Sequence, residues 1–459
     1  MAVENGRAWP EDRRPHAPTR PAPLRALAPT GSTTSAPKPV DALVVDANLR
    51  QALLAVRALG RTGLTVGVAE SQDECKQALG VPAFTSKWSA WHRVLPGIAN
   101  DPGGYACALF DLVREHPARV LIPSSDASIA ALRPWRTDFE KLGVSVALAS
   151  EPALDVANDK QRTMELAAEL GIPYPRSVEH VRADAIPAAV CDIGYPAVVK
   201  PVQSWVRCGD IATRVGPQVV TSRAEAVRCA ERLGELGCST LVQQWVGGSR
   251  ESVDLIYARG RVYAEFAQVA YRMTPVLGGV AVVRESIPMP DDIRHAAVRL
   301  VHALDLEGYC EVEFRRDDAG RPLLMEINAR LTGGIEVAVR SGVDFPTLLW
   351  RWAAGEALEP VHGYRPGVRM RNLHSDVKWL VENMSRQGLP DSTPRLRAVA
   401  TFAAEFLRRN AYDYVDRGDL RPAWRAFTRD AQDAGRRLVR HARSRAGGAA
   451  APSSKEIQR

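Results

Sequence analysis

The residues best suited to chemistry are polar side chains in the segment from Cys310 to Gly334. Glu326 and Asn328 alternate there with Met325 and Ile327. Side chains of a β-strand alternate between its two faces. We therefore expect Met325 and Ile327 to point one way, and the carboxylate and the amide to point the other.

A turn is predicted where Asp317-Asp318-Ala319-Gly320 separates two apolar runs of this segment. If the turn is centred on Ala319-Gly320, Glu313 lies nearly opposite Glu326 in an antiparallel hairpin. Two carboxylates and the amide oxygen of Asn328 then converge, which costs free energy unless a cation is bound. A hard divalent cation such as Mg²⁺, shared with the phosphates of a nucleotide, would satisfy them. The alternative is a solvated hairpin with a polar outer face, but the apolar residues between the acids favour a buried sheet.

The run Met-Glu-Ile-Asn-Ala-Arg, Met325 to Arg330, resembles the metal-binding hairpin of the ATP-grasp superfamily. That superfamily includes carbamoyl phosphate synthetase, biotin carboxylase and D-alanine–D-alanine ligase. The resemblance implies Glu313, Glu326 and Asn328 as ligands of Mg²⁺, or of Mn²⁺. It implies Arg330 as a contact to the substrate or to an acyl phosphate, so that Asn328 and Arg330 are the predicted catalytic residues.

Two lysines precede the hairpin at positions that suit phosphate binding. Lys200 ends the apolar run Tyr195 to Val199, and Lys160 stands just before a predicted helix. Either lysine alone would be interpreted as a surface charge. In ATP-grasp enzymes two cationic residues at such positions hold the nucleotide phosphates as point charges, so ATP is the implied cofactor.

The segment Gln243-Gln244-Trp245-Val246 resembles the linker of ATP-grasp domains against which adenine lies. By this match Gln244 and Val246 would contact the base through backbone groups, and Glu251 would accept hydrogen bonds from the ribose. The loop after Lys200 departs from the pattern, because Gly209 is its only glycine where many relatives have more. How this loop closes over the phosphates is therefore open.

Arginines and glycines near the hairpin are candidates for substrate binding. Arg272 precedes a flexible segment and Arg284 follows it, while Gly333 and Gly334 follow the metal hairpin. A guanidinium suits a carboxylate or phosphate, and glycines let backbone N–H groups approach an oxyanion.

Composition excludes several classes of protein. The chain has 459 residues, 46% apolar and 25% charged, which is ordinary for a soluble globular protein. No apolar run approaches the ~20 residues that span a bilayer, so stable membrane insertion is not expected. The formal net charge is +7, but residues 1–40 carry +3 and residues 436–459 carry +6, leaving −2 for the rest. This distribution disfavours nucleic-acid binding by the folded part. Seven scattered cysteines without a Cys-x-x-Cys pair indicate reduced thiols in the cytoplasm.

Alternating strand and helix patterns predict an α/β protein with a parallel sheet, and the resemblance implies the α+β ATP-grasp fold for the part that follows. Ala42–Val45, Leu64–Ala69, Arg119–Pro123 and Val144–Ala149 are predicted strands, with a helix at Gln51–Leu59. The first strand leads into Asp46-Ala47-Asn48-Leu49 and not into a Gly-x-Gly-x-x-Gly loop, which disfavours dinucleotide binding. Ser124-Ser125-Asp126 is better explained as a helix N-cap than as a catalytic group.

Five parts of the chain are predicted. They are a disordered tail (1–39), a Rossmann-like domain (40–155), an ATP-grasp domain (156–360) with its lid at about 196–243, a largely helical extension (361–445) and a second disordered tail (446–459). In the extension, Trp424, Phe427, Ala431, Ala434 and Leu438 share a helical face that we expect to dock on the protein.

The favoured interpretation is an ATP-dependent carboxylate–amine ligase that forms an amide through an acyl phosphate. Its N-terminal part is similar to that of D-aspartate ligase-like proteins. The implied partners are a small-molecule carboxylate and an amine, such as amino acids, in a cytoplasmic enzyme that could be a homodimer. Two alternatives stay open. One is a bicarbonate-activating enzyme like carbamoyl phosphate synthetase or biotin carboxylase, and the other is a non-catalytic ATP-binding regulatory protein.

Overall fold

The computed structural model describes residues 39–77, 80–201, 205–208, 211–236, 240–386, 388 and 390–432. For residues 76, 77, 179, 180, 205–208 and 211–214 only the backbone is described. The two predicted disordered tails lie outside these residues, except for Pro39. The helical positions Ala434 and Leu438 also lie outside them.

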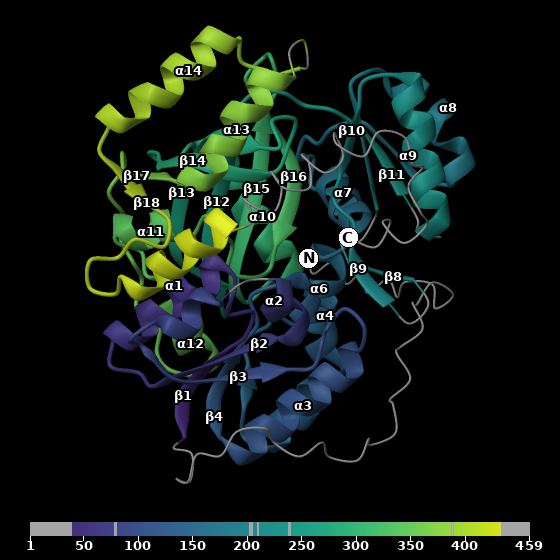
Figure 1. Cartoon of the computed structure of the whole chain (residues 1–459). Helices are drawn as coiled ribbons and strands as arrows, with labels where there is room; N and C mark the ends of the chain where they lie inside the picture. The colour runs from purple at the N-terminus through teal and green to yellow at the C-terminus, as the bar shows by residue number, and fades with distance from the viewer. Residues whose placement is uncertain are drawn as a thin grey trace, which may run out of the picture. The chain divides into compact units, whose positions relative to one another are not determined.

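The N-terminal part of the described chain is a parallel sheet, drawn in purple and blue in Figure 1. Its strand order is β3-β2-β1-β4-β5, so the order reverses between β1 and β4. In such sheets ligands bind beyond the carboxyl ends of the strands at the reversal. The strands are β1 (Val40–Val44), β2 (Val66–Ser71), β3 (Ser89–Leu95), β4 (Ala118–Ile122) and β5 (Ser145–Val146). The helices are α1 (Arg50–Arg61), α2 (Gln72–Gln77), α3 (Pro102–Glu115), α4 (Asp126–Leu132), α5 (Arg136–Lys141) and α6 (Glu151–Ala157), with short 3₁₀ turns at Pro82–Thr85 and Arg133–Trp135.

This sheet confirms the predicted Rossmann-like order, with one shorter strand. The predicted strand Val144–Ala149 pairs only at Ser145–Val146. Ser125 caps α4 by accepting a hydrogen bond from the backbone of Ser128, which confirms the N-cap interpretation.

A second, four-stranded sheet has the order β10-β7-β11-β6 and carries two helices on one side. A separate two-stranded β8–β9 hairpin lies between β7 and β10 in the chain, within the range predicted for the lid. The strands are β6 (Ser177–Val181), β7 (Ala197–Pro201), β8 (Trp205–Cys208), β9 (Ile211–Arg214), β10 (Gln218–Val220) and β11 (Thr240–Gln244). The helices are α7 (Lys160–Glu169), α8 (Ile186–Ile193) and α9 (Arg223–Leu236), with a 3₁₀ turn at Ala183–Ala185.

The third sheet has seven strands in the order β16-β15-β12-β13-β14-β17-β18. Its strands are β12 (Arg250–Ala258), β13 (Arg261–Thr274), β14 (Val280–Ser286), β15 (Gly308–Arg316), β16 (Pro322–Asn328), β17 (Arg369–Arg371) and β18 (Asn410–Tyr412). Its helices are α10 (Asp291–Leu304), α11 (Glu336–Ser341) and α12 (Phe345–Ala353). β17 and β18 come from the region predicted to be largely helical. They are three residues each, too short to show an alternating pattern.

Helices also occur in the C-terminal part, namely α13 (Leu373–Ser385), α14 (Arg395–Ala404), a 3₁₀ turn at Glu405–Leu407 and a helix over residues 421–432. The docking prediction for the last helix is wrong. Trp424 and Phe427 are 69% and 64% exposed, whereas Ala426 is 3% exposed. The small side chain of Ala426 allows close approach to the protein on the other side of the helix.

The parallel sheet and the seven-stranded sheet share their hydrophobic cores. One core contains Val44 and Leu53 of the first sheet region together with Phe345 and Trp350 of α12. Trp350 also donates through Nε1 to the backbone oxygen of Asp41 at 2.9 Å. This common packing fixes the carboxyl ends of β1 and β4 against the hairpin that holds the acidic residues. No described helix is long and apolar enough to cross a membrane.

Candidate functional site

The predicted hairpin is formed by β15 and β16, and its register places Glu313 opposite Glu326. Glu311 lies opposite Asn328. The prediction that Met325 points the same way as Ile327 is wrong. The hairpin contains a bulge, because Phe314 pairs with Leu324 and leaves Met325 as an extra residue. Met325 therefore lines the cavity beside Glu326, while Ile327 packs in the core as expected.

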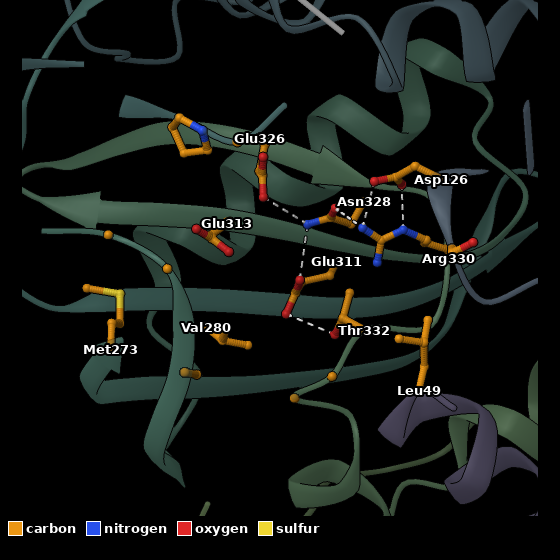
Figure 2. Close-up of a pocket in the computed structure, with 18 of the residues that line it drawn as sticks. Leu49, Asp126, Met273, Val280, Glu311, Glu313, Glu326, Asn328, Arg330 and Thr332 are labelled. Carbon is orange, nitrogen blue, oxygen red and sulfur yellow. Dashed lines mark hydrogen bonds and ion pairs between the residues drawn. The ribbon is translucent and has the colours of Figure 1, made fainter. Parts of the chain in front are cut away.

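Carboxylates from both strands gather on the cavity face of this hairpin (Figure 2). Burial, together with the nearby charges of Glu326 and Glu311, raises the pKa of Glu313 to about 7, against the opposing effect of Arg250. Burial alone would raise the pKa of Glu326, but the surrounding Lys160, Lys200 and Arg330 outweigh it and lower that pKa. The pKa values of the two opposed glutamates are thus shifted in opposite directions.

A third acid, Glu311, was missed by the sequence reasoning. Its carboxylate accepts hydrogen bonds from Asn328 Nδ2 and from Thr332 Oγ1, each at 3.2 Å. The signal was present in the sequence. Glu311 precedes Glu313 by two residues, so the alternation of the strand places both on one face.

Arg330 links the hairpin to the parallel sheet. Its Nε donates to Asp126 Oδ1 at 2.6 Å, and its Nη2 donates to Asp126 Oδ2 at 3.2 Å and to Asn328 Oδ1 at 3.3 Å. Burial would lower the pKa of the guanidinium, but Asp126 holds it above the ordinary value. The N-terminus of α4 therefore positions Arg330 over the acidic wall (Figure 2).

Lys200 and Lys160 reach the same cavity from different elements. Lys200 is 6% exposed on β7 and donates to Gln243 Oε1 at 2.9 Å. Burial, with the nearby charge of Lys160, lowers the pKa of Lys200 to about 8. Lys160 begins α7 directly after the N-cap Asp159. The two predicted phosphate ligands are thus brought together.

A cavity of about 780 Å³ joins these groups. It extends from β7, β11 and the β13–β14 connection, across the acidic hairpin, to the carboxyl ends of β1, β2 and β4. This volume is in the range of small-molecule and cofactor sites.

Of the two residues predicted to contact the base, one lines the cavity and the other is not among the described lining residues. Val246 lines the cavity, and its backbone oxygen accepts from Arg315 Nη1 at 2.8 Å. Gln244 is not among the described lining residues, and its backbone N–H already donates to Arg176 O at 2.8 Å. Its neighbour Gln243 lines the cavity, and within the part of the chain that the structure describes the buried Nε2 of Gln243 has no hydrogen-bond partner. Gln243 therefore offers an unused donor beside Lys200.

Three residues were predicted to contact the nucleotide or the substrate but are not among the described residues that line the cavity. They are Glu251, Arg272 and Arg284. Glu251 lies on the opposite face of β12, where both its oxygens accept from Arg316 Nε at 3.0 Å. Arg250, one residue earlier on the strand, faces the cavity and lies 3.4 Å from Glu313. Strand alternation explains this difference.

The two predicted substrate arginines are buried in ion pairs. Arg272 Nη1 lies 2.9 Å from Asp376 Oδ1, and its guanidinium stacks over Trp379 at 4.3 Å from the ring centroid. Arg284 is 1% exposed and pairs with Asp413. Both therefore join the C-terminal part to the seven-stranded sheet. Gly333 and Gly334, in contrast, line the cavity as predicted.

The donor set suits a hard divalent cation. Glu313, Glu326 and Asn328 supply oxygen atoms on one wall, and Lys200 and Lys160 line the same cavity, close enough to Glu326 to lower its pKa. Among the described residues, no three Asp, Glu, His or Cys side chains converge closely enough to hold a metal alone. That agrees with Mg²⁺ chemistry, in which one or two carboxylates act with substrate phosphates and waters. The residues present therefore fit a nucleotide-associated Mg²⁺.

Comparisons with known proteins agree with this arrangement. Residues 238–375 match a family model described as "ATP-grasp in the biosynthetic pathway with Ter operon". D-Alanine–D-alanine ligase of Pseudomonas entomophila is 24% identical over 314 residues, 64% of this chain and 93% of that protein. The carbamoyl phosphate synthase large chain of Methanoregula boonei is 23% identical over 261 residues, 53% of this chain but 23% of that protein.

Solved structures share the fold. Biotin carboxylase from Campylobacter jejuni, solved as a β-γ-ATP complex, has a TM-score of 0.56 and 18% identity over 72% of this chain and 74% of its own. L-Amino acid ligase from Bacillus licheniformis has a TM-score of 0.54 and 16% identity over 69% and 75%.

Proposed function

This chain belongs to the ATP-grasp superfamily, and from that premise we propose that it is an ATP-dependent carboxylate–amine ligase. One observation supports the proposal most strongly. The paired acids Glu313 and Glu326 line the same cavity as Lys200 and Lys160. Acidic and basic walls facing each other suit a nucleotide triphosphate with its cation. A solvated hairpin, the alternative from the sequence, would not be buried in this way.

In this proposal ATP occupies the end of the cavity between β7, β11 and the hairpin. Lys200 and Lys160 bind the phosphates, and Val246 contacts the base. Gln243 replaces Gln244 in the assignment, because its Nε2 is buried beside Lys200 and no described residue bonds to it. Glu251 has no assigned role, because its carboxylate is paired with Arg316.

Glu313, Glu326 and Asn328 would hold Mg²⁺. The cation, when bound, neutralises charge on the transferring phosphoryl group. The protein's part is to hold the lysines and Arg330 in fixed positions, so that positive charge is already arranged where negative charge develops.

The proposed reaction has two steps. An oxygen of the substrate carboxylate forms a bond to the γ-phosphorus of ATP while the bond to the β–γ bridging oxygen breaks, giving an acyl phosphate and ADP. A neutral amine then attacks the acyl carbon, the bond from that carbon to the phosphate oxygen breaks, and a proton leaves the nitrogen. Arg330 and the backbone of Gly333 and Gly334 line the part of the cavity where the acyl phosphate would lie.

The proposal is tested by screening pairs of carboxylates and amines while measuring ADP and product mass together. The wild-type protein is expected to release ADP and an amide in equal amounts, with a requirement for Mg²⁺. Glu326→Gln should lose both products, whereas Asp318→Asn, an exposed acid in the turn of the same hairpin, should keep them. ATP binding without turnover across a broad panel would favour the non-catalytic alternative.

Cytoplasmic location and a homodimer stay predictions. The biotin carboxylase domain of Hydrogenobacter thermophilus 2-oxoglutarate carboxylase, with a TM-score of 0.56 and 17% identity, was solved as a dimer. Light scattering of the purified protein would decide the oligomeric state here.

A further inference from the structure

The C-terminal strap, residues 413–432, lies against helix α1 of the parallel sheet (Figure 1). It follows β18 and lies beyond the residues that match the family model. Three of its aspartates, spaced three residues apart, pair with arginines of α1. The pairs are Arg50 with Asp413, Arg61 with Asp416 and Arg57 with Asp419.

The strap also supplies part of the cavity wall, through Tyr414 and Arg429. Arg429 is 15% exposed as a side chain, and its Nη1 donates to Asn48 Oδ1 at 3.0 Å. Its guanidinium lies 5.5 Å from the ring centroid of Tyr414. The Nε of Arg429 donates to Oδ1 of its acidic neighbour Asp430 at 3.2 Å. Its two Nη atoms donate to neutral acceptors, Asn48 Oδ1 and the hydroxyl of Tyr414.

Asn48 connects Arg429 to an acid on the other side. Asn48 Nδ2 donates to Glu74 Oε2 at 3.2 Å, and Glu74 also lines the cavity. A single carboxamide thus separates a guanidinium from a carboxylate. Burial is the chief cause that raises the pKa of the neighbouring Glu70 to about 8. Glu74 is half-buried at this end of the cavity.

The hydroxyl of Ser124 gives an independent sign of a ligand at this end of the cavity. Ser124 is fully buried and lines the cavity, and its Oγ has no hydrogen-bond partner among the described residues. Ser124 follows β4, next to the reversal of strand order, where open α/β sheets bind ligands. A polar group of a substrate would satisfy this atom.

We propose that the strap completes the amine-substrate site, with Arg429 binding a carboxylate and Glu74 binding the ammonium of one zwitterionic amino acid. This inference rests on the proposed ligase function. The neutral side chain of Asn48 is bonded to both Arg429 and Glu74. The carboxylate and the ammonium of a zwitterion would replace these two hydrogen bonds with shorter, stronger charge-assisted ones. We assign the molecule bound there as the amine substrate, because its carboxylate is occupied by the ion pair with Arg429 and is not free to attack ATP. Its ammonium loses a proton before the neutral amine attacks the acyl carbon.

The test compares Arg429→Gln with Arg421→Gln, an exposed arginine on the same helix. Amino acids are assayed beside their carboxamides, which keep the ammonium but lack the carboxylate. Loss of one charged hydrogen-bonding partner should raise the KM for the amino acid roughly ten- to hundredfold and abolish its preference over the carboxamide. Arg421→Gln should behave like the wild type, and thermal melting checks that both variants are folded.

Two further measurements separate this inference from the ligase proposal. Trapping of the acyl phosphate with hydroxylamine reports the first step alone, and Arg429→Gln should leave it unchanged. Equal loss of trapping and of amine use would overturn the inference, and so would an unchanged KM. If the wild type forms no acyl phosphate with any acid, the ligase proposal fails. Calorimetric binding of the same amino acids then tests Arg429 and Glu74, through Arg429→Gln and Glu74→Gln. Binding that is absent, or insensitive to both variants, would overturn the inference.

Discussion

Replacing Asp413 with asparagine is expected to destabilise the attachment of the strap strongly. The carboxylate is 2% exposed and pairs with Arg284 and Arg50, whose side chains are 1% and 14% exposed. It also accepts from Asn372 Nδ2 at 2.9 Å. Burial would raise the pKa of Asp413, but the two arginines hold it far below the usual range.

The magnitude follows from what the substitution leaves behind. An asparagine keeps the shape and one acceptor, but two buried or half-buried guanidinium groups lose their counter-charge. Breaking a buried ion pair in this way costs about 3–5 kcal/mol. Because the folded-state pKa of Asp413 is depressed, this stabilisation is present above the unfolded pKa of about 3.9. It is lost as the pH falls through the lower folded-state value.

Hydrogen exchange of the strap amides, with urea unfolding followed by circular dichroism, measures the effect at pH 7. Asp416→Asn is the matched control on the same strap, because Arg61 is 41% exposed and such pairs contribute about 0–1 kcal/mol. The strap of Asp413→Asn should open far more readily than that of Asp416→Asn. Equal effects of the two substitutions would refute the burial argument.

Three further predictions follow from the buried charges. The free enzyme should bind ATP progressively more weakly above pH 8, because Lys200 loses its proton there. Lys200→Met should weaken binding roughly ten- to hundredfold and remove that pH dependence. A pH profile of the ATP dissociation constant checks both expectations. Glu70→Gln should raise the melting temperature at pH 8 more than at pH 5. The raised pKa of Glu70 means that its stabilising contribution is present below the unfolded pKa of about 4.3 and is lost as the pH rises towards 8. Arg272→Met should lower the melting temperature, because it breaks the buried pair with Asp376, while leaving the KM of both substrates unchanged; a raised KM with intact stability would restore a substrate role.

The hairpin was predictable because local rules determine it. The turn at Asp317-Gly320 and the strand alternation together gave the pairing of Glu313 with Glu326. The bulge at Met325 was not predictable from alternation, because the inserted residue interrupts the very period on which the prediction depends.

Residues that depend on contacts distant in sequence were predicted less well. Glu251 was assigned from the resemblance, but its strand face directs it to Arg316. Arg284 pairs with Asp413, which lies 129 residues later in the chain. No local pattern reports such a pairing, and the exposed side of the C-terminal helix was likewise decided by the docking of Ala426 and Arg429.

The most direct test of the central claim is stoichiometric detection of ADP and an amide product for the wild type and for Glu326→Gln. Equal amounts of both are expected from the wild type in the presence of Mg²⁺. A loss of at least about hundredfold is expected from a folded Glu326→Gln variant, with Asp318→Asn unaffected. Wild-type ADP release by folded Glu326→Gln would contradict the assignment of the acidic hairpin.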